Sequence, residues 1–204
     1  MTTIGYKAFD NCNSLETITM PNSITHIGFW AFHGCSSLKS ISIPKGVTII
    51  DEQTFSGCCN LTSVTIPNSV TEIGAAAFMD CRSLKSITIP NSVTRIKWHA
   101  FEGCESLELI TIPESLTDIA NDAFRGCEHL TTKTIPSNVT IIGEDTIDGK
   151  KDLESIVKLL CVNPKKLQVV VTDVPCFNHY RKNNINIFHV NDYNNSSLKN
   201  RYMA

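Results

Sequence analysis

The amino-acid sequence predicts a solenoid, a coil of short stacked repeats, and two observations lead to this prediction. The first is a single interval of 23 residues that separates Ile4, Ile27, Ile50, Ile73, Ile96, Ile119 and Ile142. The second is that phenylalanine, from Phe9 to Phe124, and cysteine, from Cys12 to Cys127, recur at the same interval. Constant spacing without insertions implies that equivalent residues stack, each repeat burying its apolar positions against its neighbours.

The most regular repeat runs from residue 73 to residue 95 and predicts two extended pieces and a turn. Ile87 and Ile89 alternate with polar residues, so we expect a short strand with these two side chains inward. Pro90 ends this strand, and Val93 begins a second extended piece on another wall. The Gly-x-x-Ala-Phe segment is too short for an independent helix and predicts a helical turn.

The repeat Ile-Gly-x-x-Ala-Phe-x-x-Cys-x-x-Leu-x-x-Ile-x-Ile-Pro resembles the BspA-type leucine-rich repeats, from residue 4 to about residue 158. The resemblance implies a leucine-rich-repeat solenoid, an α/β-type superhelix made mostly of short β-segments. Such a coil is right-handed, with a parallel sheet on one face and a C-terminal cap. It also implies a surface or secreted protein that takes part in adhesion and binds host or matrix proteins.

Three segments follow from the repeat pattern. Residues 1–158 form the solenoid, about seven repeats of which the first is incomplete and the last degenerate. Residues 159–190 resemble the family's cap, with strands at 167–171 and 185–190 and a helix at 175–182. A cap covers the bare strand edge of the last repeat. Residues 191–204 form a polar tail.

The N-terminal end begins within a repeat at Ile4, with nothing before it to cover the first coil. This motivates a second hypothesis, a structural or self-assembling solenoid that forms a homo-oligomer through its N-terminal face.

Composition narrows the classes of partner. A formal net charge of −2 gives no general basic surface, so nucleic acid is not an expected partner. No stretch is apolar enough for a membrane span, and the start does not read as a signal peptide. The absent signal and the many cysteines favour the cytoplasm, whereas the family resemblance implies the cell surface or secretion. The sequence alone does not decide between them.

The cysteine column predicts buried thiols that act as small core residues, because stacked side chains run parallel and do not face each other for a disulfide. Cys59, beside Cys58, is the better candidate for an exposed, reactive thiol. The nearest approach to a metal-binding set is Cys161, Cys176, His179 and His189. Because zinc sites usually combine two close pairs of ligands, we expect no metal site and no cofactor.

Catalytic signatures are missing from the sequence: it contains no nucleophile motif, phosphate-binding loop or zinc-protease helix. We therefore expect a non-catalytic protein. His26, His33, His99 and His129 stand at variable positions and read as surface histidines.

The outward positions of the first strand form a flat array of hydroxyl groups, with candidate partner-binding residues Ser40, Ser42, Ser63, Thr65, Ser86, Thr88 and Thr111. One interpretation is structural, since threonine suits strand surfaces and hydroxyl ladders support neighbouring strands. The other is a hydrogen-bonding surface for a protein or glycan partner. A third interpretation, an ice-like periodic surface, fits less well because serines and Leu109 interrupt the threonines.

Aromatic residues occupy variable positions between the glycine and the alanine of the repeat, at Tyr6, Phe29, Trp30 and Trp98. Exposed aromatic patches are typical interface anchors. The alternative is that the aromatic residues of the first repeats fold over the open end. The sequence thus predicts a binding protein that acts in protein–protein interaction or adhesion through the Ser/Thr-rich face.

Overall fold

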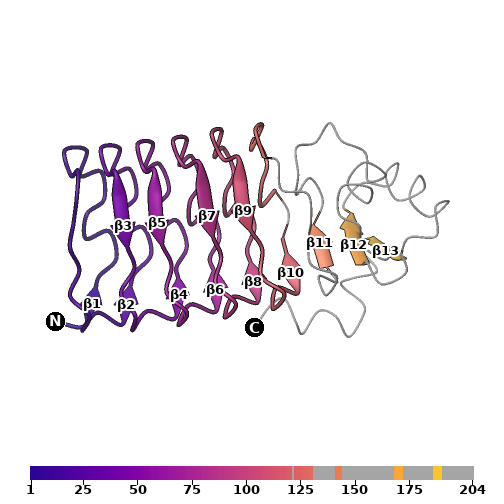
Figure 1. Ribbon diagram of the computed structural model, residues 1–204, viewed down its shortest axis with the longest axis horizontal. Coiled ribbons are helices and arrows are strands. Elements are labelled where there is room, and N and C mark those ends of the chain that lie inside the picture. Colours follow the sequence, from indigo (N-terminus) through magenta and orange to yellow (C-terminus); the bar gives the residue numbers. More distant parts are fainter. Residues whose placement is uncertain (121, 131–140, 144–167, 172–185, 190–204) are drawn as a thin grey trace.

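The computed structural model describes residues 1–120, 122–130, 141–143, 168–171 and 186–189. Within these residues the chain winds as a solenoid, and equivalent residues of neighbouring coils lie 23 positions apart (Figure 1). For example, Asp118 pairs with Arg95 and Ile119 with Ile96. The predicted repeat and its register are therefore confirmed.

One wall carries a continuous parallel sheet of seven strands. Its order is β13 (Asn186–His189), β12 (Gln168–Val171), β11 (Ile141–Gly143), β10 (Asp118–Ile119), β8 (Arg95–Ile96), β6 (Glu72–Ile73) and β4 (Ile49–Ile50). A separate pair, β1 (Thr3–Ile4) and β2 (His26–Ile27), begins the same wall. Each two-residue strand points its second residue, an isoleucine, into the core.

A second wall carries the Ser/Thr-rich strands β3 (Ser40–Ser42), β5 (Ser63–Thr65), β7 (Ser86–Thr88) and β9 (Leu109–Thr111). Within the described residues these strands pair as β3 with β5 and as β7 with β9, and β5 does not pair with β7. The N–H of Ile43 donates to the carbonyl of Thr65 at 3.0 Å, but Ile66 forms no such bond with Thr88. This corrects the sequence prediction. The main sheet was expected on the wall of Ile87 and Ile89, but it runs along the wall of the second extended piece, which begins at Val93.

The third wall corrects the expected helical turn. Residues in the left-handed region recur there twice per coil, as at Ala76 (φ 50°) and Asp80 (φ 57°). Left-handed residues cannot continue a right-handed helical turn, and they direct alternate N–H groups toward the next coil. The N–H of Phe78 accordingly donates to the carbonyl of Ala100 at 2.8 Å. This wall is a stack of hydrogen-bonded turns.

In one left-handed column, two glycines follow each residue that has a side chain: Asn11, Gly34, Gly57, Asp80, Gly103 and Gly126. Gly103 (φ 69°) lies beside Asp80 of the preceding coil, and a Cβ atom at Gly103 would come within 2.8 Å of Asp80 Oδ1. Gly34 stands in the same relation to Asn11. Gly126 follows Gly103, and its Cβ would meet only ordinary contacts. The left-handed conformation favours glycine at both positions, although Asn11 and Asp80 also adopt it in this column, and at Gly103 glycine additionally leaves room for the Asp80 carboxylate.

The core consists of stacked columns of equivalent side chains. Phenylalanine rings lie parallel along the axis, with 5.4 Å between the centroids of Phe78 and Phe101. The residues predicted to point inward in the most regular repeat are all buried: Ile73, Phe78, Cys81, Leu84, Ile87, Ile89 and Val93. Among the described residues no helix is long and apolar enough to traverse a membrane.

Strands β12 and β13 confirm the two extended runs expected in residues 159–190, and both add in parallel to the seven-stranded sheet. The expected helix at 175–182, the polar tail, and Cys161, Cys176 and His179 lie outside the described residues.

Candidate functional site

The hydroxyl face is the surface formed by the outward side chains of β3, β5, β7 and β9. All seven candidate residues on it are exposed: Ser40, Ser42, Ser63, Thr65, Ser86, Thr88 and Thr111. Strand alternation puts them outward, because Ile41, Ile87 and Ile110 on the same strands are buried. The structure therefore brings these seven residues together on one surface.

The hydroxyl groups of this face are free of internal partners. In the described part of the chain, none of the seven forms a side-chain hydrogen bond with another protein group. Another threonine column behaves differently: the hydroxyl of Thr71 donates to the carbonyl of Thr48 at 3.2 Å, and that of Thr117 to Thr94 at 3.3 Å. The hydroxyl ladder considered for the strands is thus found elsewhere, and the hydroxyl face can satisfy its groups only with water or a partner.

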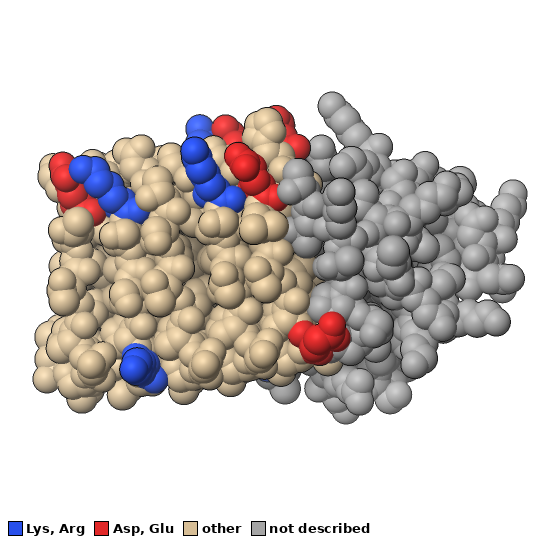
Figure 2. Space-filling model, viewed as in Figure 1, with Lys and Arg blue, Asp and Glu red and all other residues tan. Residues whose placement is uncertain are grey.

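Charged side chains border the hydroxyl face, and its broad centre is uncharged (Figure 2). On one border Lys39 Nζ lies 2.6 Å from Glu16 Oε2. The Lys39 ammonium, by hydrogen bond and charge, lowers the pKa of the Glu16 carboxyl. Leu109, which interrupts the hydroxyl pattern, is exposed and adds an apolar spot to the face.

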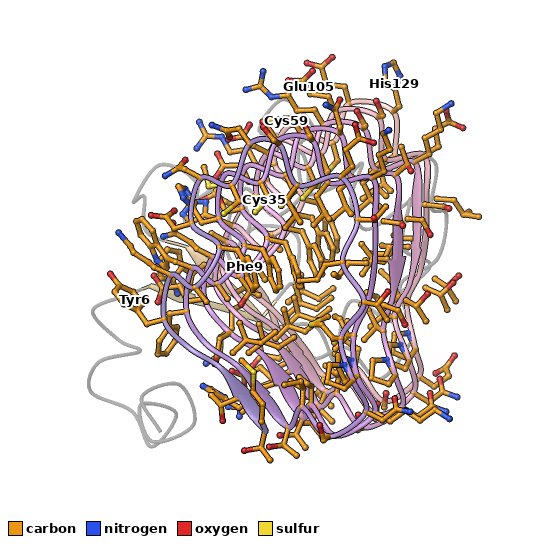
Figure 3. The ribbon with its side chains drawn as sticks, turned by 90° about the vertical axis from the view of Figure 1, so that its left-hand side faces the viewer. Tyr6, Phe9, Cys35, Cys59, Glu105 and His129 are labelled. Atoms are coloured by element: carbon orange, nitrogen blue, oxygen red, sulfur yellow. The ribbon has the colours of Figure 1, made fainter. Side chains whose placement is uncertain are left out.

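Tyr6 lies on the wall of turns, on the side of the coil opposite the hydroxyl face (Figure 3). Phe29, Trp30 and Trp98 belong to the same segment of later repeats. Tyr6 and Phe29 are exposed in neighbouring coils, and Trp98 is exposed three coils from Phe29. Tyr6 points away from Phe9 and the core, so it does not fold over the end of the solenoid (Figure 3). The eleven candidate residues thus divide between two opposite surfaces.

Trp30 belongs to a cluster that the sequence did not reveal. The Lys7 ammonium lies 4.5 Å from the centre of its ring, and the His33 ring lies 4.7 Å away. His33 Nδ1 is 2.8 Å from Asp10 Oδ1. These partners come from two neighbouring coils and hold Trp30 along the wall, so Trp30 contributes less exposed surface than Tyr6 or Phe29.

A similar group surrounds Trp98, whose ring meets His99 edge to face at 5.3 Å. His99 Nδ1 lies 2.6 Å from Glu102 Oε2. His33 and His99 are therefore half-buried and paired with carboxylates, a correction to their reading as plain surface histidines, whereas His26 and His129 are exposed.

The cysteine column is buried as predicted from Cys35 to Cys127, and the structure adds a hydrogen bond to that prediction. Each of these five thiols donates to the phenylalanine carbonyl of the preceding coil, as from Cys81 Sγ to Phe55 O at 3.3 Å. Burial raises the pKa of the Cys35 thiol to about 11 and raises the pKa of Cys81 well above its ordinary value. These thiols are poor nucleophiles.

Cys59 is half-buried rather than exposed, and its Sγ lies 3.4 Å from the carbonyl oxygen of Gly57. Cys12 is the exposed member of the column. Within the described residues no three His, Cys, Asp or Glu side chains gather in a way that could hold a metal ion.

Comparison with known proteins agrees with this architecture. The model of the BspA type leucine rich repeat region matches in six copies, over residues 2–108, 48–159 and 71–200. No curated protein matches.

Three solved structures are similar. A leucine-rich repeat protein from Bacteroides ovatus is 28% identical with a TM-score of 0.71, over 91% of this chain and 54% of its own length. The T. pallidum leucine-rich repeat protein is 25% identical with a TM-score of 0.62, over 92% of this chain and 78% of its own. A Eubacterium ventriosum protein is 23% identical with a TM-score of 0.63, over 73% of this chain and 43% of its own, and supports the fold alone. The chain thus spans about half of the Bacteroides protein.

Proposed function

Because the chain belongs to the BspA-type leucine-rich repeat family, whose model matches most of its length, we propose that it is a non-catalytic protein-binding module that acts through the hydroxyl face. A role in adhesion is one form of this proposal. The carrying observation is that seven exposed hydroxyl groups on a flat, uncharged surface have no partner among the described residues.

The hydroxyl face can complement the polar surface of a partner. Hydroxyl groups both donate and accept, so a regular array of them can adapt to the polar groups of a partner. Coils that repeat every 4.8 Å or so place these groups at a fixed period along the axis. Charged side chains along the border should raise the rate at which a partner associates in the correct orientation more than they raise its affinity.

The experiment introduces opposite charges at the centre of the face with the double variant Ser63→Glu, Thr88→Arg. A matched control, Tyr6→Arg with Phe29→Glu, makes the same charge changes on the aromatic wall. A binding partner captured by the wild-type chain is identified by mass spectrometry, purified, and titrated against each protein by calorimetry.

We expect both variants to melt like the wild-type protein, since all four residues are exposed. The hydroxyl-face variant should lose binding and the aromatic-wall variant should keep it. The reverse result would move the function to the aromatic wall and refute the proposal.

A further inference from the structure

Two adjoining hollows interrupt the border of the hydroxyl face at Lys45. One has a volume of about 330 Å³ and a mixed lining, in which Met20, Ile43, Pro44 and Pro67 lie beside polar residues that include Ser42 and Thr65 of the hydroxyl face. The other, of about 390 Å³, adjoins it on the far side of Lys45 and Pro67. Volumes of this size lie at the small end of the range for ligand pockets.

The hollows lie where two coil-to-coil hydrogen bonds of the repeat are missing. Met20 N–H does not bond to the carbonyl of Ser42, although the equivalent bond from Ile43 is formed. At the adjacent corner Thr48 N–H does not bond to Thr25, although the bond from Thr71 N–H to Thr48 is formed at 2.8 Å. Both statements hold within the described residues. These backbone groups are therefore available to a ligand beside the hollows. Between them the two coils stay in close contact, because a Cβ atom at Gly46 would come within 2.8 Å of Ile24 O.

The sequence departs from the repeat at the same place. Lys45 and Gly46 stand where most repeats have Asn-Ser. The serine of the following repeat, Ser69, donates to the carbonyl of Val47 at 2.6 Å, a bond that Gly46 has no side chain to make. The turn at Lys45 and Gly46 therefore lacks the serine hydrogen bond between coils and carries a lysine in place of asparagine.

Lys45 carries an exposed charge beside the hollows. It is exposed and has no ion pair in the described part of the chain, whereas Lys39 on the opposite border is paired with Glu16. An unpaired ammonium group at the rim of a partly apolar hollow attracts a carboxylate whose neighbouring group can enter that hollow.

We propose that Lys45 and the adjoining hollows bind an extended peptide segment of a partner protein that presents a carboxylate side chain two residues from an aliphatic one. In an extended chain, such side chains lie on the same face about 6.7 Å apart. The aliphatic group enters the hollow lined by Met20 and Pro67, and the carboxylate pairs with Lys45. This inference rests on the proposed function and names the chemistry of the partner.

The test uses a fluorescent peptide of three Val-Thr-Glu-Thr repeats, which places valine and glutamate on one face when extended. Peptides with glutamine or lysine in place of glutamate serve as matched probes, and binding to the full chain is followed by anisotropy. We expect affinity to fall in the order glutamate, glutamine, lysine, and the glutamate peptide to bind less tightly as salt concentration rises.

Variants assign the charge effect to one residue. Lys45→Ala should weaken binding of the glutamate peptide by roughly fivefold, the upper range for an exposed ion pair. Lys45→Glu should reverse the order and favour the lysine peptide. Lys39→Ala removes another exposed cation, from the opposite border, and should leave all three affinities unchanged.

The proposal is overturned if no peptide binds the wild-type chain, if glutamate and glutamine peptides bind equally, or if Lys39→Ala matches Lys45→Ala. It fails separately from the proposed function: a natural partner lost by Ser63→Glu, Thr88→Arg but kept by Lys45→Glu would leave the hydroxyl face as the binding surface without this anchor. Melting temperatures of the Lys45 variants should equal that of the wild type, since the side chain is exposed.

Discussion

The hydroxyl face and the corner threonines, which are Thr25, Thr71, Thr94 and Thr117, contain the same chemical groups in opposite circumstances. Each corner hydroxyl donates to a backbone carbonyl of the preceding coil. The hydroxyls of the face bond to no other protein group in the described chain. Repetition of a polar residue in a solenoid therefore has no single meaning: one column joins the coils and the other is available for binding.

The largest effect should come from the buried side of a face strand. Ile87 is buried between Ser86 and Thr88 on β7, so Ile87→Ala should lower the free energy of unfolding by roughly 2–5 kcal/mol. Thr88→Ala on the same strand should change it by less than about 0.5 kcal/mol. Urea denaturation compares them, and equal losses would mean that the outward hydroxyls also stabilise the strand.

The buried thiols are hydrogen-bond donors that join the coils inside the core. They should also make the free energy of unfolding depend on pH. Burial raises the pKa of Cys81 and Cys104 above the ordinary value of 9.0, so the folded state retains protons that the unfolded state releases. The stabilisation is complete below pH 9 and decreases as the pH rises above it.

Unfolding measured in urea between pH 7 and 10.5 tests this expectation. The double variant Cys81→Ala, Cys104→Ala should show a shallower decline at alkaline pH than the wild type. An identical slope in both proteins would assign the decline to other groups and contradict the prediction.

The smallest effect concerns the two hydroxyl arrays themselves. Thr71→Val with Thr94→Val removes two hydroxyl donors of the corner column and should cost about 1 kcal/mol in total. Thr65→Val with Thr88→Val removes two hydroxyls from the face and should leave stability unchanged or slightly raised. Chemical denaturation measures the free energy of unfolding of both double variants. Equal decreases would contradict the prediction that only the corner hydroxyls stabilise the fold.

Much of the fold follows from spacing alone. Columns such as Phe78 and Leu84 are apolar in nearly every repeat, and stacking at a constant interval leaves them nowhere but the core. The outward position of Ser86 and Thr88 follows from strand alternation in the same way.

Features that depend on backbone conformation were less predictable. The left-handed position occupied by Trp30, Ala76 and His99 carries no glycine signal, so the sequence suggested a helical turn there. Nor could alternation alone tell which wall pairs continuously, because the bonds between coils depend on local separation. The hollows beside Lys45 did have a sequence signal, the change from Asn-Ser to Lys-Gly, but its consequence required the coil geometry.

The glycine column has a consequence for how such a protein can change by duplication. Asp80 is accommodated because the next coil offers Gly103, and Asn11 because the next coil offers Gly34. A copy of the Asn11 coil inserted directly before the Asp80 coil would place a Cβ atom against the asparagine side chain, which would have to rotate away. A gain or loss of coils is therefore accommodated most easily where a glycine still follows each Asn or Asp of this column.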